Sequence, residues 1–188
     1  MLYCLYWHSE NINAGRMNKA IRIITGVLVA WVLSPKRAYG FSGGFADRDS
    51  YLGYHNLPKG IRNNNPGNLK MTSIQWKGKI PAARNTDGAF EQFERYVYGI
   101  RAMMKDILND MGKGKNTIRK IISEYAPASE NATEAYIDQI SRYTGFGPDQ
   151  PLAPTYLTFV RLIPEMIKHE NGLPAITQRQ FDEAWAMI

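Results

Sequence analysis

The chain has 188 residues, of which 44% are hydrophobic and 12% aromatic, and this composition is sufficient for one globular domain with an apolar core. Its formal net charge is +6, but five of the 23 basic and one of the 17 acidic residues lie in residues 1–40, so the remainder carries only +2. A nearly balanced domain lacks the basic surface that binds a phosphate backbone, and we therefore expect no nucleic-acid partner.

Residues 1–40 have the pattern of an export leader. The basic segment Met17–Arg22 precedes an uncharged apolar run, Ile23–Leu33, and the small-x-small triplet 38–40 follows. This order is typical of a cleaved secretory signal peptide, and the run is shorter than the ~20 residues that span a bilayer. An uncleaved anchor is the alternative, and Met17 is the start that fits the pattern. We expect an exported protein of the periplasm or cell envelope that meets the membrane only through this leader.

The residue types beyond the leader limit the possible chemistry. The one cysteine, Cys4, lies in the leader, so the remaining chain has no disulfide and no thiol nucleophile. Its histidines, His55 and His169, are not part of a His, Cys and Asp group with metal-ligand spacing, and no Gly-x-Ser-x-Gly motif occurs. The sequence therefore predicts no metal and no cofactor. Carboxylates are the groups left for acid–base catalysis.

A linker and an unusual turn follow the leader. Residues 41–58 are rich in Gly, Ser, Asp and Tyr and are predicted to be a linker. Residues 59–69 contain three consecutive asparagines and an Asn-Pro-Gly-Asn sequence, which excludes a regular helix or central strand there. Gly67 is expected to supply the positive φ of a tight turn. The amides of Asn65 and Asn68 can bind the backbone, a ligand, or both.

Residues 61–93 are predicted to form a small β-hairpin subdomain. The segment Ile74–Ile80 can form a short strand, residues 85–88 have the composition of a turn, and Ala89–Phe93 alternates apolar and polar residues. Trp76 is followed by a lysine and a glycine. We expect its ring to be exposed as a platform for a sugar.

Helical periodicity extends over the rest of the chain, so the predicted fold class is α+β and mainly helical. Pro164 either kinks the fourth helix or begins a new one at its first turn. Gln180 occupies the capping-box position after the Thr177 cap of the last helix. The helices are predicted from Tyr96 to Gly112, from the Thr117 cap to Pro127, from Thr133 to Gly145, from Thr155 to Gly172 and from Thr177 to Ile188.

Glu170 extends the apolar face of the fourth helix. It follows Ile163, Met166 and Ile167 at the spacing i, i+3, i+4, i+7, so its side chain is predicted to point toward the core. It also lies in the last helical turn, where the helix dipole disfavours a negative charge. Both effects favour the protonated acid, as a general acid requires. The alternative is a structural glutamate at a helix end beside His169.

A second polar cluster precedes the third helix. Glu130, Asn131 and Thr133 are followed by Tyr136 one helical turn later. The simplest interpretation is helix capping by Asn131 or Thr133, with Glu130 complementing the helix dipole.

Taken together, seven short motifs resemble a known superfamily, that of the virion-associated and prophage-encoded lytic proteins with lysozyme-like or lytic-transglycosylase-like domains. The resemblance covers residues 59–172, within a domain that we expect at residues 59–188. The motifs, in chain order, are Lys59-Gly-Ile-Arg-Asn-Asn-Asn-Pro-Gly-Asn-Leu69, Trp76-Lys-Gly78, Phe90-x-x-Phe93, Gly99-Ile-Arg-Ala102, Tyr125-Ala-Pro127, Glu130-Asn-x-Thr133-x-x-Tyr136-Ile137 and His169-Glu-Asn-Gly172.

The resemblance implies a helical bundle and a hairpin around a cleft for peptidoglycan glycan strands, with a helix-terminal Glu as general acid. The superfamily places that Glu before the hairpin, whereas the similar segment here, Met166–Gly172, comes after the bundle. A circularly permuted order would reconcile the two. The resemblance then implies Glu170 as the acid, with Glu130 and Glu91 as alternatives. The residues that it implies for substrate binding are Asn65, Asn68, Trp76, Asn131, Thr133 and Tyr136.

The expected activity is cleavage between N-acetylmuramic acid and N-acetylglucosamine. Hydrolysis by a muramidase requires two carboxylates at a defined separation, and the sequence identifies no second one. This favours a lytic transglycosylase with one Glu, in which the 6-hydroxyl of the sugar attacks and a 1,6-anhydro product forms. The alternatives are a peptidase that cleaves the peptide cross-link and a non-catalytic wall-binding or virion structural module. The sequence does not indicate which oligomeric state the protein adopts.

Overall fold

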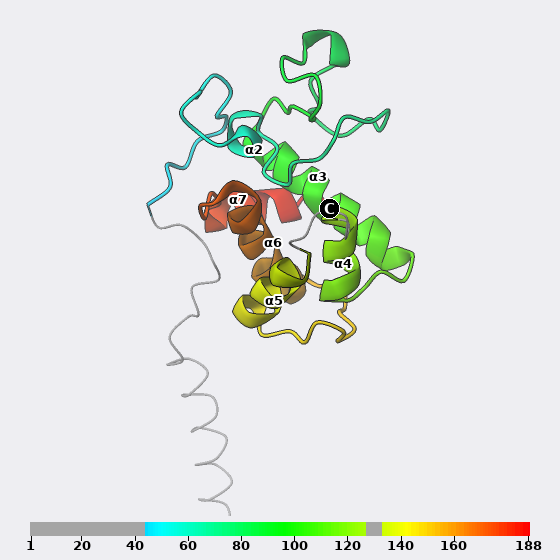
Figure 1. The fold of residues 1–188 in the computed structure, drawn as a ribbon. Coiled ribbons are helices and arrows are strands. Elements are labelled where there is room, and N and C mark those ends of the chain that lie inside the picture. Colours follow the sequence, from blue (N-terminus) through cyan, green and yellow to red (C-terminus); the bar gives the residue numbers. More distant parts are fainter. Residues whose placement is uncertain (1–43, 127–132) are drawn as a thin grey trace, which may run out of the picture. The chain divides into compact units, whose positions relative to one another are not determined.

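The computed structural model describes residues 44–126 and 133–188, and the predicted leader lies outside them. The described part is mainly helical, as the sequence predicts (Figure 1). None of its helices has the length and apolar character needed to cross a bilayer. The elements are α2 (Lys59–Arg62), the 3-10 helix η1 (Ala82–Arg84), α3 (Tyr96–Gly112), α4 (Ile118–Tyr125), α5 (Thr133–Thr144), α6 (Tyr156–Asn171) and α7 (Gln178–Trp185).

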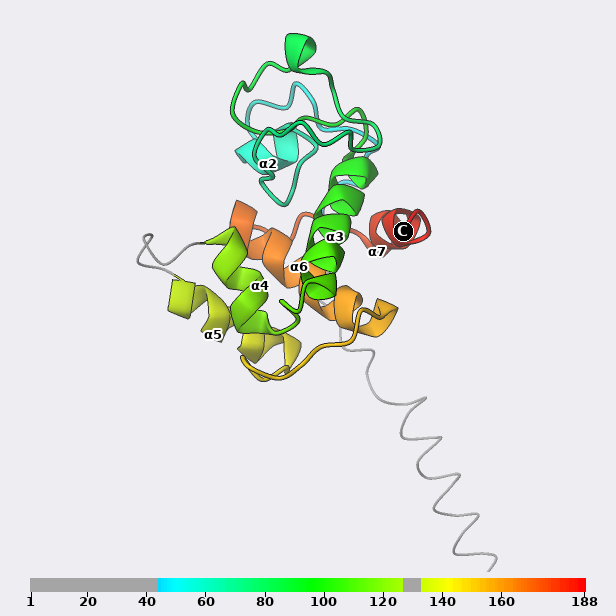
Figure 2. The same cartoon turned by 90° about the vertical axis from the view of Figure 1, so that its right-hand side faces the viewer.

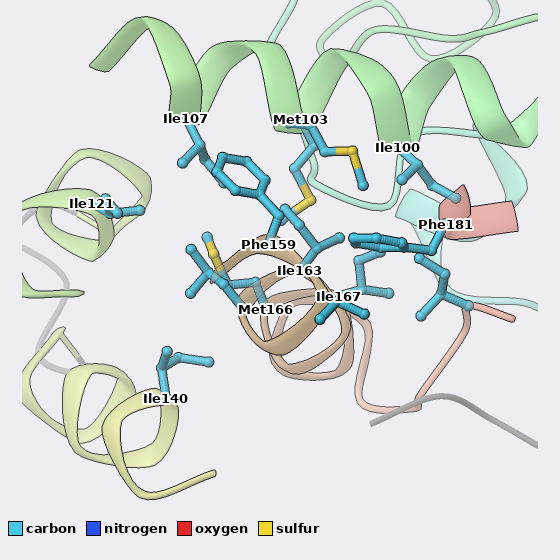
Figure 3. Close-up of a cluster of buried hydrophobic side chains, with 14 of the residues drawn as sticks. Ile100, Met103, Ile107, Ile121, Ile140, Phe159, Ile163, Met166, Ile167 and Phe181 are labelled. Carbon is cyan, nitrogen blue, oxygen red and sulfur yellow. The ribbon is translucent and has the colours of Figure 1, made fainter. Parts of the chain in front are cut away.

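Helices α3 and α6 form the centre of the core. Their apolar side chains face each other, α4 and α5 pack to one side and α7 to the other (Figure 3). The periodic apolar stripes of the sequence supply these contacts, because residues three and four apart share one helix face. The central side chains have no exposed surface: Ile100, Met103 and Ile107 from α3, and Phe159, Ile163, Met166 and Ile167 from α6.

Three of the predicted helix caps are present. The hydroxyls of Thr117, Thr155 and Thr177 each accept a hydrogen bond of 3.3 Å from the backbone N–H three residues later. The Thr177 cap is completed by Gln180, whose side-chain oxygen accepts from the Thr177 N–H at 3.1 Å. Helix α6 is continuous through Pro164, so this proline does not begin a new helix.

The predicted hairpin is reduced to two isolated antiparallel bridges, Lys70 with Phe90 and Lys79 with Phe93. Among the described residues, neither 74–80 nor 89–93 forms a regular strand. Side chains take the place of the missing ladder: Lys79 Nζ donates to the carbonyls of residues 72 and 74, and a Glu91 carboxylate oxygen accepts from the backbone N–H of residue 72. The irregular segment, residues 70–93, lies at the N-terminal end of α3 (Figure 2).

The turn of residues 63–68, called the asparagine turn below, differs from the prediction in its backbone. Asn64 and Asn68 adopt the left-handed conformation, with φ of 52° and 49°, whereas Gly67 does not. Asparagine tolerates this region better than most residues. Gly67 is required by packing instead, because a Cβ there would lie 2.9 Å from Met103 Cγ on α3.

The described part of the predicted linker, residues 44–58, packs against the helices. Tyr51 is 1% exposed, and its ring centroid lies 4.7 Å from that of Tyr96. Gln180 Nε2 on α7 donates to the Arg48 carbonyl at 3.0 Å. These residues therefore belong to the folded unit, although their Gly, Ser and Asp content is typical of a linker.

Candidate active site

Three distant parts of the chain meet at the Glu170 carboxylate. Asn68 Nδ2 donates to Glu170 Oε2 at 3.1 Å, and Tyr136 Oη donates to Glu170 Oε1 at 3.1 Å. Asn68 Nδ2 also lies 3.3 Å from the Glu170 backbone oxygen. The asparagine turn, α5 and the end of α6 thus fix the orientation of one carboxylate.

Gly60 and Asn171 hold the turn against α6. Asn171 Nδ2 donates to the carbonyls of Pro66 at 2.8 Å and Ile167 at 2.9 Å. Gly60 lies so close that a Cβ there would collide with the Asn171 side-chain oxygen and lie 2.6 Å from Asn68 Oδ1. A glycine at residue 60 is therefore needed to bring Asn68 to Glu170.

Glu170 lines a cavity of 520 Å³. Its walls come from the asparagine turn, from α3, from α4 and from the end of α6, and they carry four carboxylates. This volume lies within the usual range for small-molecule sites. The lining residues are Gly67, Asn68, Leu69, Lys70, Phe90, Asp106, Asp110, Glu124, Tyr125 and Glu170.

Asp106 differs from the other carboxylates that α3 and α4 place in this cavity. Lys115 Nζ lies 2.6 Å from Glu124 and 3.9 Å from Asp110, whereas Asp106 has no ion pair with any described residue. Burial raises the pKa of the half-buried Asp106 carboxyl, and the negative charge of Asp110 raises it further. Asp106 is thus a candidate second acid that the sequence did not reveal. Its position beside the buried Ile107 on α3 was the available signal.

Tyr125, which lines the cavity, has a buried hydroxyl. This hydroxyl makes no hydrogen bond within residues 44–126 and 133–188. Burial raises the pKa of Tyr125 well above its usual value, and the charges of Asp106, Glu170 and Asp110 add to the shift. The phenol therefore stays protonated at neutral pH. A buried hydroxyl without a partner among the described residues is costly.

Tyr136 and His169 form the support behind Glu170. Burial raises the pKa of Tyr136 well above its usual value, with a further contribution from Glu170, so Tyr136 acts as a donor to that carboxylate. The Tyr136 and His169 rings stack with centroids 3.4 Å apart. His169 Nδ1 lies 3.0 Å from Gln139 Oε1, and burial lowers the pKa of His169. The imidazole is thereby tied to α5.

Of three other residues predicted for the site, Asn65 and Thr133 make structural hydrogen bonds and Trp76 lies outside the cavity lining. The Asn65 side chain is buried and bonds the carbonyls of Leu69 at 2.9 Å and Glu91 at 3.0 Å. The Thr133 hydroxyl donates to the Ala126 carbonyl at 2.7 Å. Trp76 is half-buried rather than exposed, and it is not among the residues that line the cavity.

Of the two alternative acids, Glu91 and Glu130, the structure describes only Glu91. Glu91 has no exposed surface, and it forms an ion pair of 2.8 Å with Lys79 away from the cavity. Glu130 lies outside the described residues, as does Asn131. In the part of the chain that the structure describes, no group of three or more His, Cys, Asp or Glu side chains is arranged to hold a metal ion.

Comparison with known proteins finds a phage relative. No protein-family profile matches the sequence. The chain is similar to Protein P5 of Pseudoalteromonas phage PM2, with 38% identity over 118 residues, which cover 61% of this chain and 71% of the phage protein. The name of that relative states no activity.

Proposed function

The chain belongs to the family of Protein P5 of Pseudoalteromonas phage PM2, and we propose that it cleaves the glycan strands of peptidoglycan. One observation carries this proposal. The Glu170 carboxylate is oriented by Asn68 and Tyr136 at the wall of a 520 Å³ cavity. A positioned carboxyl group in a concave polar site is what acid-catalysed cleavage of a glycosidic bond requires.

In the proposed reaction, protonated Glu170 gives its proton to the glycosidic oxygen between N-acetylmuramic acid and N-acetylglucosamine. The resulting carboxylate then accepts the proton of the attacking hydroxyl. Asn68 and Tyr136 keep the carboxylate in place. The proposed fold is a lysozyme-like bundle in circularly permuted order, with the irregular segment in the place of the hairpin.

We propose the transglycosylase route, in which the 6-hydroxyl of the sugar attacks and a 1,6-anhydro product forms. Hydrolysis instead needs a second carboxylate about 5–9.5 Å from the acid. Asp106, in the same cavity, is the residue to test for that role. Asp106→Asn should leave the transglycosylase reaction within a few-fold of the natural rate, whereas it should abolish hydrolysis. Mass spectrometry separates the anhydro product from a reducing sugar.

Glu170→Gln is the direct test. Loss of the general acid should lower the rate of cell-wall clearing by on the order of 10²–10⁴. The amide keeps the shape of the side chain and removes a charge at a helix C-terminus, but it replaces one of the two acceptor oxygens with a donor, so the melting temperature should change little. Turbidity of purified cell walls and a thermal melt measure the two quantities.

Glu165→Gln is the matched control, because Glu165 is a buried carboxylate on α6 that does not line the cavity. It should retain full clearing. If Glu170→Gln clears walls at the natural rate, the assignment of the acid is wrong. Release of free peptide would indicate cross-link cleavage, and the absence of clearing by the natural protein would indicate a non-catalytic module.

A further inference from the structure

A second cavity, of 620 Å³, lies apart from Glu170 and shares no lining residue with the first. It is formed where residues 52–55 and the end of α2 face the segment that includes η1. None of its residues takes part in the proposed cleavage. Its lining consists of Leu52, Gly53, His55, Arg62, Asn63, Ile80, Arg84, Thr86, Asp87 and Gln92.

The polar amides of this cavity are already satisfied. Asn63 Nδ2 donates to Asp87 Oδ2 at 2.9 Å, and Gln92 Nε2 donates to Asn63 Oδ1 at 2.9 Å. Gln92 Oε1 in turn accepts from the Thr86 N–H at 2.9 Å. These bonds join the asparagine turn to the segment after η1. The cavity is therefore fixed in shape before any ligand enters, which lowers the entropic cost of binding.

Two guanidinium groups of the cavity lack partners among the residues that the structure describes. The side chains of Arg62 and Arg84 make no ion pair or hydrogen bond with the described residues, whereas Arg95, Arg119 and Arg179 are each paired with carboxylates. Both groups are charged at any physiological pH.

Asp87, the one carboxylate of the lining, does not neutralise these two arginines. It accepts from Asn63 and from the Phe90 N–H at 3.1 Å, and Lys59 Nζ lies 3.9 Å from it. The cavity therefore presents a net positive charge. The side chains of Leu52 and Ile80 add apolar wall beside the free guanidinium groups.

We propose that this cavity binds a carboxylate of the stem peptide that branches from a peptidoglycan strand. An arginine fork matches a carboxylate in two-bond geometry, and the apolar wall suits the short aliphatic side chains of such a peptide. Lys59 links the two cavities without lining either of them: its Nζ lies 3.9 Å from Asp87 of one and 5.0 Å from the Phe90 ring centroid of the other. A strand held near Glu170 can thus present its peptide here. The identity of the ligand rests on the proposed function.

Calorimetric titration with a soluble stem tetrapeptide tests binding without any catalysis. The double variant Arg62→Gln/Arg84→Gln should bind at least tenfold more weakly than the natural protein, with an unchanged melting temperature because the two side chains lack partners in the fold. Arg142→Gln is the control, since Arg142 is an exposed residue of α5 outside both cavities. A peptide with its carboxylates converted to amides should not bind.

Three results would overturn the proposal: equal peptide binding by the double variant, equal binding of the amidated peptide, or binding of inorganic phosphate without binding of the peptide. The last result would assign the arginines to phosphate.

A second assay compares glycan strands with and without stem peptides. The double variant should lose kcat/KM on peptide-bearing strands and keep its rate on bare strands.

The two proposals can fail separately. If Glu170→Gln clears walls normally, the proposed acid is wrong, and the tetrapeptide titration still decides the role of Arg62 and Arg84. If clearing depends on Glu170 but peptide binding does not depend on the arginines, only the peptide site is wrong.

Discussion

The four asparagines of residues 63–68 carry the same side-chain amide, but three are buried and one is half-buried. Asn63, Asn64 and Asn65 are at most 3% exposed, and their amides bond other parts of the turn and its neighbours. Asn68 is half-buried, and its amide reaches the Glu170 carboxylate. Burial thus separates asparagines that build the turn from the one that is available to a site.

Asn68→Gly should lower activity and leave stability nearly unchanged. Glycine adopts the φ of 49° without strain, so the substitution removes the amide alone. Loss of an orienting hydrogen bond to the proposed acid should reduce the clearing rate by on the order of tenfold or more. A turbidity assay and a thermal melt on the same preparation measure both effects.

Asn64→Gly is the control with the same backbone class, since Asn64 has φ of 52°. Its buried amide donates to the Phe93 carbonyl at 2.8 Å and accepts from the Tyr51 N–H at 2.8 Å, so its loss should cost about 2 kcal/mol or more. Equal stability losses for the two variants would mean that Asn68 is structural as well.

His169 should make the fold sensitive to acid. Burial lowers its pKa below the ordinary 6.5, so the unfolded chain binds this proton more readily than the folded chain. The folded state therefore loses stability as the pH falls below 6.5, and the effect is absent at higher pH. Between pH 7.5 and 5, the melting temperature of His169→Gln should fall less than that of the natural protein.

The exposed His55 supplies the control for this pH series. His55→Gln removes an exposed imidazole that makes no hydrogen bond or ion pair with the described residues, so its melting curve should follow that of the natural protein. Carboxylate titration is common to all three proteins and cancels in the comparison. Parallel curves for His169→Gln and the natural protein would show that the imidazole does not titrate differently on folding.

At the scale of elements, helices were predictable because their information is local. Thr117, Thr155 and Thr177 mark helix starts, and apolar spacing marks the buried faces. The absence of regular strands from the described residues was not predictable from alternation alone, because Lys79 and Glu91 bond nearby backbone groups through their side chains. Here side chains from distant positions override the local preference.

The candidate site was predictable only in part for the same reason. Glu170 followed from helical spacing, and Asn68 from the turn. Asp106 and Tyr125 come from α3 and α4, and no local pattern indicates that these helices share a cavity with the turn. The second cavity, of 620 Å³, likewise depends on the close approach of α2 and η1, which are separated by a segment without regular structure.

At the scale of the folded unit, residues 44–58 join its first part to its last helix. Arg179 Nε on α7 lies 2.7 Å from Asp47 Oδ2, and Gln180 Nε2 donates to the Tyr51 hydroxyl at 3.2 Å. The Tyr96 N–H, at the start of α3, donates to the Asp49 carbonyl at 2.7 Å. This segment thereby contacts both α3 and α7, and it contributes an aromatic ring to the core.

Removal of residues 44–58 should therefore unfold the domain or weaken it strongly. Within the complete chain, Tyr51→Ala should lower the free energy of unfolding by about 3–5 kcal/mol, because the ring is fully enclosed. Tyr54→Ala is the matched control: this ring is 38% exposed, and its loss should cost less than about 1 kcal/mol. Denaturant titration of both variants, and of a chain that begins at Lys59, measures the difference. A shortened chain as stable as the complete one would show that these residues are a linker, since a packed segment cannot be removed without exposing the apolar surface that it covers.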